Sequence, residues 1–496
     1  MDRARRLLPV YELPVRPLIR NTVGRRLLGG VIAIVMILSI VVPLVRMAST
    51  AQALPLYSAR EGRTCDNCHL SPNNWKNPPL AQRKCTMSCV ACHYDPSGGG
   101  LRNASGRFFG RATLPMIATS PRPTQDWDRG FGRHDHATTY SDSLPQGPAT
   151  FEEARDWPEP PRDTYAKGSP PGDSRYALFD GRYGRLNADP LIRIGWDVRI
   201  ASIISASTIL FPMQVDLGGA LHPLHHMTVV ANVGARGRVN GLSDTIDDPS
   251  TPALREGYVL LHEAPFQSYV KAGRFIPQFG VRLDDHTTLT RKLFEMDVSL
   301  LESRVVGIEV GANPNYPFAT VSWFRSAPNN ERLDSFNILE NLTGYGFAAN
   351  AGWRGEGWSL GAGALMRERP VPDGGDARSF SFNGSLNPWK WNPNVPLTWS
   401  GEVVFGERTR ESGRTAEVAA AYQELDWRAR NGLDFFLIQD WGDPDRDVID
   451  DESLRFSGGV RLTPIPGVTL DGRLRALAPA GDQSGVDGFI QLHLWN

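Results

Sequence analysis

Two short cysteine motifs hold the side chains of this sequence that are best suited to chemistry. Each runs Cys-x-x-Cys-His, and the members are Cys65, Cys68 and His69 in the first and Cys89, Cys92 and His93 in the second. The two thiols of such a motif can bind a haem covalently while the imidazole ligates its iron, so the pattern is the attachment signal of c-type haem. The sequence therefore predicts two covalently bound haem c groups, with His69 and His93 as the proximal iron ligands.

A zinc site is the alternative interpretation of these motifs, because Cys-x-x-Cys is also the commonest half of a zinc site. The two complete motifs account for all but one of the chain's five cysteines, and each places a histidine where a zinc site needs none. This favours haem. The remaining cysteine, Cys85, has no sixth cysteine to pair with, so we expect a buried thiol there unless a haem thiol is given up.

The amino-terminal segment has the pattern of an export signal. Residues 1–26 are rich in arginine, residues 27–45 are almost entirely apolar, and Ala51 and Ala53 supply a small-residue cleavage site. We expect a signal peptide over 1–53. The alternative is a retained membrane anchor, because the apolar run approaches the roughly 20 residues that span a bilayer. In both cases the haem motifs lie beyond the inner membrane, which points to a Gram-negative periplasm or the compartments outside it.

The rest of the chain divides into three stretches of different composition. Residues 54–115 form a di-haem segment that is rich in Gly, Asn and Arg, and residues 116–190 form a proline-rich linker. Residues 191–496 then change to segments in which apolar and polar side chains alternate, as in 454–463. A period of two predicts β-strands with one apolar and one polar face. This texture fits both a soluble sandwich and a transmembrane barrel.

The connections within 191–496 favour the barrel. Tight turns broadly alternate with long polar connections, which is typical of barrels with short periplasmic turns and longer extracellular loops. We therefore expect a mainly β fold, an outer-membrane barrel of about 16 strands, or 14 if residues 203–207 hold no turn. Aromatic residues near the strand ends suit an interfacial girdle, although ordinary strand composition explains them equally well. They are Trp353, Trp358, Trp441 and Trp495.

This arrangement resembles the fused cytochrome-porins of bacterial outer membranes. In that family a signal peptide precedes a short c-type haem segment and a porin-like barrel, and the best-studied branch oxidises ferrous iron at the cell surface with one haem motif. Residues 54–60 resemble the approach to that motif, 95–103 resemble a segment of di-haem relatives, and 282–287 add a third local likeness. The second motif departs from the iron-oxidising branch. The resemblance implies electron transfer across the outer membrane.

The sixth iron ligand sets much of a haem's potential, and His286 is the residue expected in that role. It follows two carboxylates in a long connection, 280–301, which carries more apolar side chains than a solvated loop and is expected to fold inward. A carboxylate beside a ligating histidine fixes its tautomer, which Asp284 or Asp285 can do. The alternative is a surface histidine, and the ligands would then be sought at Met87, His134 or His136.

The charge balance and the lack of other recognisable motifs exclude several classes of function. Its 53 basic and 54 acidic residues argue against nucleic-acid binding, and no other catalytic motif is recognisable. We expect an electron conduit in the bacterial outer membrane, surrounded by its lipid, with the haem segment in the periplasm or the barrel lumen. It would link a periplasmic c-type cytochrome to an extracellular donor or acceptor such as iron, and enzymatic iron oxidation or reduction stays open. The alternatives are a porin with a redox-sensing haem segment and a periplasmic haem enzyme on a soluble β scaffold.

Overall fold

The computed structural model describes three parts of the chain: residues 93–102, residues 114–117 and most of 192–495. All of them belong to one compact unit, Ala51–Asn496. Within those described residues, no helix is long and apolar enough to cross a membrane. The stretches left out of the last part are 206–207, 225–226, 240–245, 248–252, 265–267, 284, 286, 295, 297–302, 314–316, 327–341, 356, 369–375, 389–391, 393, 410–411, 431 and 479–484.

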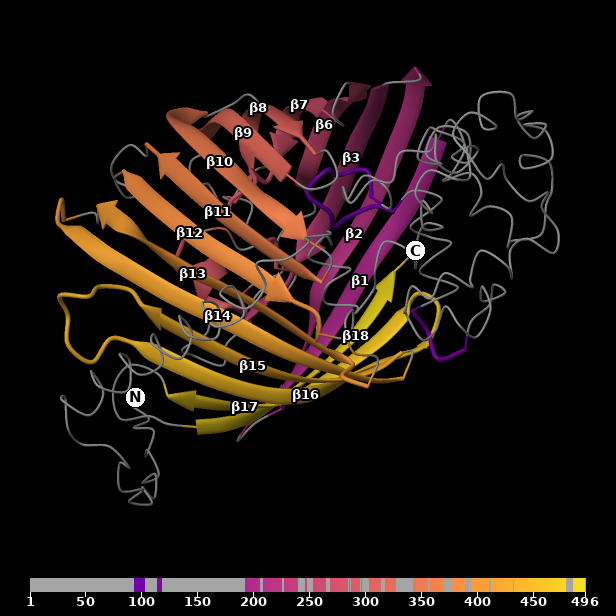
Figure 1. The fold of residues 1–496 in the computed structure, drawn as a ribbon, viewed down its shortest axis with the longest axis vertical. Coiled ribbons are helices and arrows are strands. Elements are labelled where there is room, and N and C mark those ends of the chain that lie inside the picture. Colours follow the sequence, from indigo (N-terminus) through magenta and orange to yellow (C-terminus); the bar gives the residue numbers. More distant parts are fainter. Residues whose placement is uncertain are drawn as a thin grey trace, which may run out of the picture. The chain divides into compact units, whose positions relative to one another are not determined.

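The fold is a closed antiparallel β-barrel (Figure 1). Each strand pairs with the next barrel strand along the chain, and β1 closes the barrel by pairing with β18. The strands β4 (Arg238–Val239) and β5 (Ile246–Asp247) form a separate two-stranded sheet between β3 and β6. The barrel strands are β1 (Ile192–Ile204), β2 (Thr208–Leu224), β3 (Met227–Arg236), β6 (Ala253–Ala264), β7 (Ser268–Phe275), β8 (Val305–Ala312), β9 (Pro317–Ser326), β10 (Thr343–Gly355), β11 (Trp358–Arg367), β12 (Ala377–Leu386), β13 (Leu397–Thr409), β14 (Thr415–Arg430), β15 (Leu433–Asp443), β16 (Ser453–Ile465), β17 (Val468–Ala478) and β18 (Gly485–Trp495).

The predicted count of 16 barrel strands is confirmed, and the alternative of 14 is wrong. The ambiguous region does contain a break between strands, since β1 ends at Ile204 and β2 begins at Thr208. The predicted alternation of short and long connections holds over most of the barrel, with 205–207, 387–396 and 410–414 as the exceptions. Because the strand number is even, the start of β1 and the end of β18 lie at the same rim, which we call the short-turn rim.

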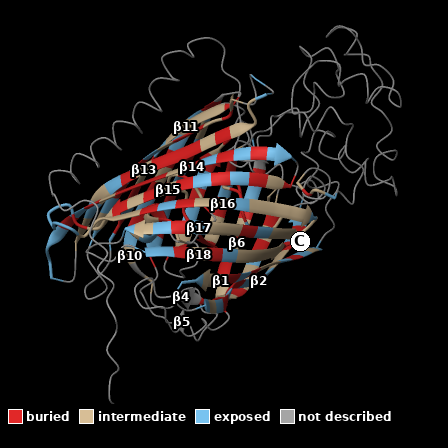
Figure 2. Ribbon diagram, turned by 90° about the horizontal axis from the view of Figure 1, so that it is seen from below, coloured by how far each residue is buried: buried red, intermediate tan, exposed pale blue. Residues whose placement is uncertain are grey.

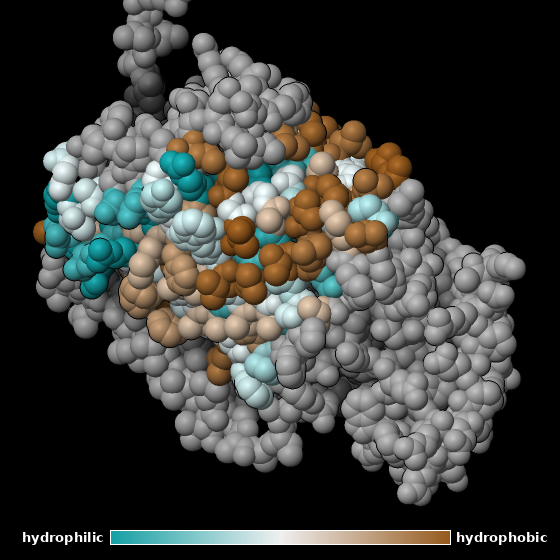
Figure 3. All heavy atoms as spheres, turned by 90° about the horizontal axis from the view of Figure 1, so that it is seen from above, coloured by the Kyte–Doolittle hydropathy of each residue, from teal (hydrophilic) through white to brown (hydrophobic). Residues whose placement is uncertain are grey.

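The barrel wall is apolar outside and charged inside. Figure 2 shows buried and exposed residues alternating along the strands, and Figure 3 shows apolar side chains gathered on the outer surface. Leu210 and Leu474 are 68% and 69% exposed, whereas Lys271, Glu309 and Asp440 are fully buried. Water would penalise such a wall by about 25 cal/mol for each Å² of apolar surface, but lipid would not. A soluble sandwich, the alternative from the sequence, is therefore wrong.

The aromatic residues expected at an interfacial girdle divide into two groups. Trp353 is 48% exposed on the outer wall, and Trp358 and Trp441 are partly exposed. Trp495 is different, because its side chain is buried and the guanidinium of Arg102 lies 3.9 Å from the centre of its ring. The girdle interpretation is wrong for Trp495, which faces inward as its place in the alternation of β18 requires.

The connection between β7 and β8, residues 276–304, folds into the barrel as expected from its apolar content. It contains the short helix α11 (Leu289–Lys292) and several buried side chains, among them Phe279, Phe294 and Met296. These pack with inward-facing wall residues and with Tyr94 from the segment that precedes the barrel. The main hydrophobic core of this protein therefore lies inside the barrel.

Candidate functional site

Of the residues predicted to bind haem, the structure describes His93 alone. The others lie outside the described residues, and their roles stay predictions. They are Cys65, Cys68, His69, Cys89, Cys92 and His286, together with the alternative ligands Met87, His134 and His136 and the odd cysteine Cys85. Within the described part of the chain, no group of His, Cys, Asp and Glu side chains is arranged to hold a metal ion.

His93 begins a tight loop, His93–Arg102, which we call the inner hairpin. His93 and Arg102 face each other in an antiparallel β-bridge, and the Tyr94 amide donates to the Leu101 carbonyl at 3.2 Å. The chain turns back through three consecutive glycines, 98–100, with φ angles of 85°, 76° and 60°. Residues with side chains rarely adopt this left-handed conformation, so the glycine run determines the hairpin.

Tyr94 fixes the hairpin to one side of the lumen. Its hydroxyl lies 3.3 Å from Nε2 of His222 in β2, and the two rings pack in a tilted arrangement with centres 5.1 Å apart. Nδ1 of His222 is 3.1 Å from the hydroxyl of Thr228 in β3, which lies 3.0 Å from Nε2 of His262 in β6. A chain of buried polar contacts thus connects the residue after His93 to three neighbouring strands.

Asp95 makes the second attachment, through its charge. Its carboxylate accepts a hydrogen bond from Nη1 of Arg282 at 3.0 Å and lies 3.6 Å from Nζ of Lys271 in β7. Burial alone would raise the pKa of Asp95, but Lys271 and then Arg282 outweigh it and hold that pKa well below the usual range. Lys271 also contacts Glu309 in β8 at 2.9 Å. The hairpin is therefore held by a buried network of alternating charges.

The contact between Asp95 and Arg282 brings together two segments that the sequence analysis identified separately. Residues 95–103 and 282–287 were noted as local likenesses, and Arg282 now donates to both Asp95 and the Ser97 hydroxyl, the latter at 2.6 Å. The hairpin also closes tightly on Arg282, since a Cβ at Gly99 would lie 3.3 Å from its Nε. Both segments are parts of one contact.

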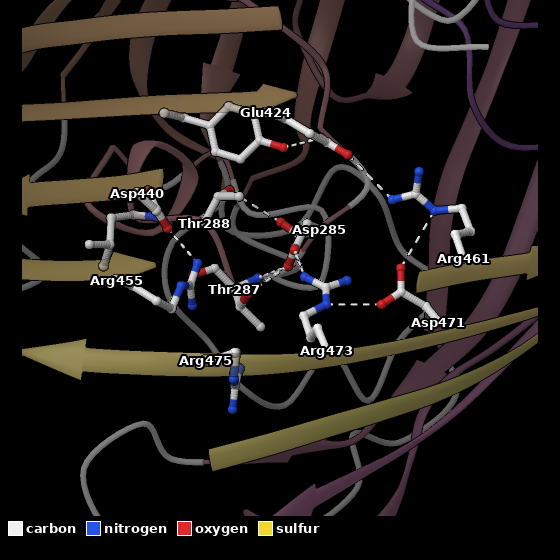
Figure 4. Close-up of polar contacts among 12 residues, drawn as sticks. Asp285, Thr287, Thr288, Glu424, Asp440, Arg455, Arg461, Asp471, Arg473 and Arg475 are labelled. Atoms are coloured by element: carbon white, nitrogen blue, oxygen red, sulfur yellow. Dashed lines mark hydrogen bonds and ion pairs between the residues drawn. The ribbon is translucent and has the colours of Figure 1, made fainter. Parts of the chain in front are cut away.

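The β7–β8 loop is held across the lumen by contacts with the far wall (Figure 4). Asp285 accepts hydrogen bonds from Thr287, through its amide at 2.8 Å, and from Arg473 in β17. Burial would raise the pKa of Asp285, but Arg473 and Arg455 hold it well below the usual range. Both oxygens of Asp285 thus have partners within the described residues. Asp284 and His286 lie outside the described residues, so the predicted orienting contact stays a prediction.

Further along the loop, backbone groups bind wall carboxylates. The Leu289 amide donates to Asp440 in β15 at 2.9 Å, and the Val281 amide donates to Glu402 in β13 at 2.9 Å. Arg291 forms an ion pair with the same Glu402. Contacts with β13, β15 and β17 therefore fix the loop from several directions.

A charged cavity lies between the inner hairpin and the wall formed by β1, β2 and β3. Its volume is about 670 Å³, including the part open to solvent. Gly100 and Leu101 of the hairpin line one side. The charged residues among its described lining are five arginines, Arg102, Arg199, Arg236, Arg282 and Arg304, and three carboxylates, Asp197, Asp216 and Glu256.

Sequence reasoning missed most of the residues that hold the hairpin. Lys271, Glu309, His222 and His262 belong to no motif, and a single lysine in a strand is ordinary. The available signal was the alternation of side chains along each strand. Each of these residues falls on the inward-facing side of its strand, where a barrel with an apolar outer surface places polar residues. That signal predicts a luminal position but names no partner.

Comparison with solved structures finds distantly similar barrels. No protein-family model matches the chain, and no curated protein matches it. An anion-selective porin from Comamonas acidovorans is 12% identical, with a TM-score of 0.45 over 62% of this chain and 99% of that chain. OprB from Pseudomonas putida is 12% identical, with a TM-score of 0.47 over 66% and 96%. OmpT of Vibrio cholerae is 8% identical, with a TM-score of 0.44 over 62% and 97%. No activity is inferred from likenesses this weak.

Proposed function

We propose that this chain is an electron conduit of the bacterial outer membrane, with two haem c groups bound at Cys65–His69 and Cys89–His93. The observation that carries the proposal is the inner hairpin. It begins at the predicted ligand His93, and its next two residues, Tyr94 and Asp95, are buried against the barrel. Because these two residues are fixed, the last residue of the second motif, His93, is held at the start of a hairpin that packs against the barrel wall.

The barrel's surfaces support a membrane position. Large apolar side chains are exposed on the outer wall, as a lipid-facing barrel requires, and charged side chains face the lumen. Strands satisfy all of their backbone hydrogen bonds when a sheet closes on itself, so closure allows a sheet to cross hydrocarbon. An outer-membrane location follows from the known occurrence of such barrels in bacteria together with the export signal expected over 1–53.

The residues present fit a haem at the second motif. When bound, a haem supplies a one-electron redox centre. The protein's part is to hold the attachment site, to surround it with packed side chains and to place cations nearby. Tyr94 and Leu101 pack into the luminal core, and Arg102 of the hairpin lies at the adjoining cavity. The partners would be a periplasmic c-type cytochrome at the short-turn rim and an extracellular donor or acceptor such as iron, with iron oxidation or reduction as the associated activity.

The first test is the mass of the mature protein, which should include two haem groups. The second uses the full chain in liposomes that enclose reduced methyl viologen, with ferric citrate outside. Oxidation of the enclosed dye should require the protein and should be lost in Cys92→Ser. Cys85→Ser is the matched control and should behave as the parent. A mature protein without covalent haem, or a Cys92→Ser variant that still passes electrons, would refute the proposal.

A porin is the second candidate, and the closed barrel with a charged, solvent-open cavity is the observation that favours it. The inner hairpin and the β7–β8 loop occupy much of the lumen, so we expect little ion flow through the parent protein. Conductance across a planar bilayer measures this directly. A large, steady conductance with no electron transfer in liposomes would establish the porin instead.

A further inference from the structure

We infer that the outer wall over β13, β14 and β15 is the contact surface between two copies of this chain in the membrane. The inference is carried by three polar side chains on that wall, Trp399, Gln423 and Gln439, which we call the glutamine row. It goes beyond the proposed function, because it depends neither on the haem groups nor on the charged lumen.

The glutamine row crosses three strands that lie side by side (Figure 1). The indole of Trp399 in β13 donates to Oε1 of Gln423 in β14 at 3.4 Å, and the Gln423 amide donates to Oε1 of Gln439 in β15 at 2.5 Å. Gln423 and Gln439 are also direct partners in the register of β14 and β15. The row ends at the Nε2 amide of Gln439, which has no hydrogen-bond partner among the described residues.

The alternation of side chains places the row on the outside of the barrel. Tyr422 in β14 and Ile438 in β15 are buried in the luminal cores, so the residues that follow them face outward. Those residues are Gln423 and Gln439, and both are partly exposed. Leu437, the next outward residue of β15, is 63% exposed. The row therefore faces lipid in a membrane-spanning barrel.

The row also lies in the middle of the wall and not at a rim. Gln439 is four residues from Phe435, on the side of the short-turn rim, and four residues from Asp443 at the other end of β15. At about 3.3 Å per residue and a tilt of about 40°, each separation is roughly 10 Å along the barrel axis. Phe435 stacks on Trp427 of β14, with ring centres 5.3 Å apart, as in an aromatic girdle. The glutamines are thus at the depth of the hydrocarbon.

An amide at this depth is unfavourable without a partner. The outward-facing residues around the row are apolar, among them Val403, Ala421, Leu425, Leu437, Trp441 and Phe456. Lipid tails accept no hydrogen bond, so a donor that faces them needs an acceptor from protein. Glutamine side chains in membrane proteins commonly form such hydrogen bonds across an interface.

A second copy of this chain supplies the acceptor. A primary amide has two donors and an acceptor oxygen with two lone pairs, so it is complementary to itself. A two-fold axis through the row brings Gln439 against the partner's Gln439, and each Nε2 can then donate to the other Oε1. Two-fold contacts of this kind are the commonest in soluble homo-oligomers. Ala421 and Gly458, which also face outward here, allow the two walls to approach closely.

Sedimentation equilibrium of the full-length protein in a neutrally buoyant detergent, at several protein-to-detergent ratios, measures the association. We expect a monomer–dimer equilibrium for the parent. Gln439→Leu removes the hydrogen bonds and suits lipid, so it should weaken the dimer about tenfold. Gln439→Asn keeps an amide and should weaken it less. Heat-modifiable migration on detergent gels shows that each variant barrel has folded.

A steric pair of variants locates the contact surface. Ala421→Trp adds a large side chain beside the row and should also weaken the dimer. Ala351→Trp is the matched control, because Ala351 is an exposed, outward-facing alanine of β10, four strands from β14 in the wall. This control should associate as the parent does.

Three results would overturn the inference. One is a parent that stays monomeric at every ratio, and another is a parent dimer that folded Gln439→Leu and Ala421→Trp leave unchanged. The third is a parent that associates through the row only with a different outer-membrane protein. None of them bears on covalent haem or on electron transfer in liposomes, so the inference and the proposed function fail separately.

Discussion

Asp95→Asn should release the inner hairpin from the barrel. Asparagine keeps the size of the side chain and one acceptor oxygen, so the turn that Asp95 forms with Ser97 at 2.8 Å can persist. What is lost is the negative charge between Lys271 and Arg282. Removing one partner of a buried ion pair costs about 3–5 kcal/mol.

Two contacts in the structure place the expected effect at the lower end of that range. After the substitution, Lys271 keeps Glu309 at 2.9 Å, and Arg282 keeps Glu256 at 3.5 Å. Neither cation is left without an anion nearby. We therefore expect a loss of about 3 kcal/mol in the free energy that holds the hairpin closed, which makes its open form roughly a hundredfold more populated.

Hydrogen exchange measured by mass spectrometry on peptides that cover 93–102 reports this population, because the Tyr94 amide is protected only while it donates to Leu101. Exchange there should be about a hundredfold faster in Asp95→Asn. Arg446→Gln is the control, since its pair with Glu417 is exposed on both sides and worth little. Parent-like exchange in Asp95→Asn would refute the view that charge holds the hairpin.

Three further predictions concern the hairpin and the β7–β8 loop. Gly99→Ala places a side chain at a φ of 76° and beside Arg282, so exchange in 93–102 should rise about tenfold, for a cost of about 1–2 kcal/mol. Arg473→Gln removes the partner of Asp285 and should raise bilayer conductance by loosening the loop, whereas Arg475→Gln, whose partner is Asp487, should not. Because the folded pKa of Asp285 lies below its unfolded value, its contribution is complete above about pH 4 and is lost as the pH falls further. Conductance that rises on acidification should therefore begin below about pH 4, and a rise that begins near pH 6 would show that a group other than Asp285 controls the loop.

The barrel could be predicted from the sequence because its signals are local. Alternation along each strand, as in 454–463, and the lengths of the connections gave the fold and the strand number. The uncertain point, 203–207, was uncertain for a physical reason. The connection between β1 and β2 is only a few residues long and has no proline or glycine to mark the turn.

The candidate site could be predicted only in part, because its contacts are not local. The glycine run at 98–100 and Arg282 were visible as unusual segments, but their contact depends on closure of the barrel. Sequence alone gives the face on which Lys271 lies, not which carboxylates it meets. Partners such as Asp95 and Glu309 are determined by the order of strands and the path of the loop, which no single segment encodes.

The interior of this barrel differs from that of an open pore in what fills it. An open pore needs a lumen whose polar groups are satisfied by water, whereas here Tyr94 and Leu101 of the hairpin pack with Phe279 and Met296 of the loop in one apolar cluster. Side chains packed in this way exclude water from that part of the lumen. The charges around the cluster are then paired with one another rather than solvated, as the Asp95 network shows. If the proposed haem is bound beside this cluster, the low dielectric and fixed charges would contribute to its potential, which is how the lumen would serve the proposed function.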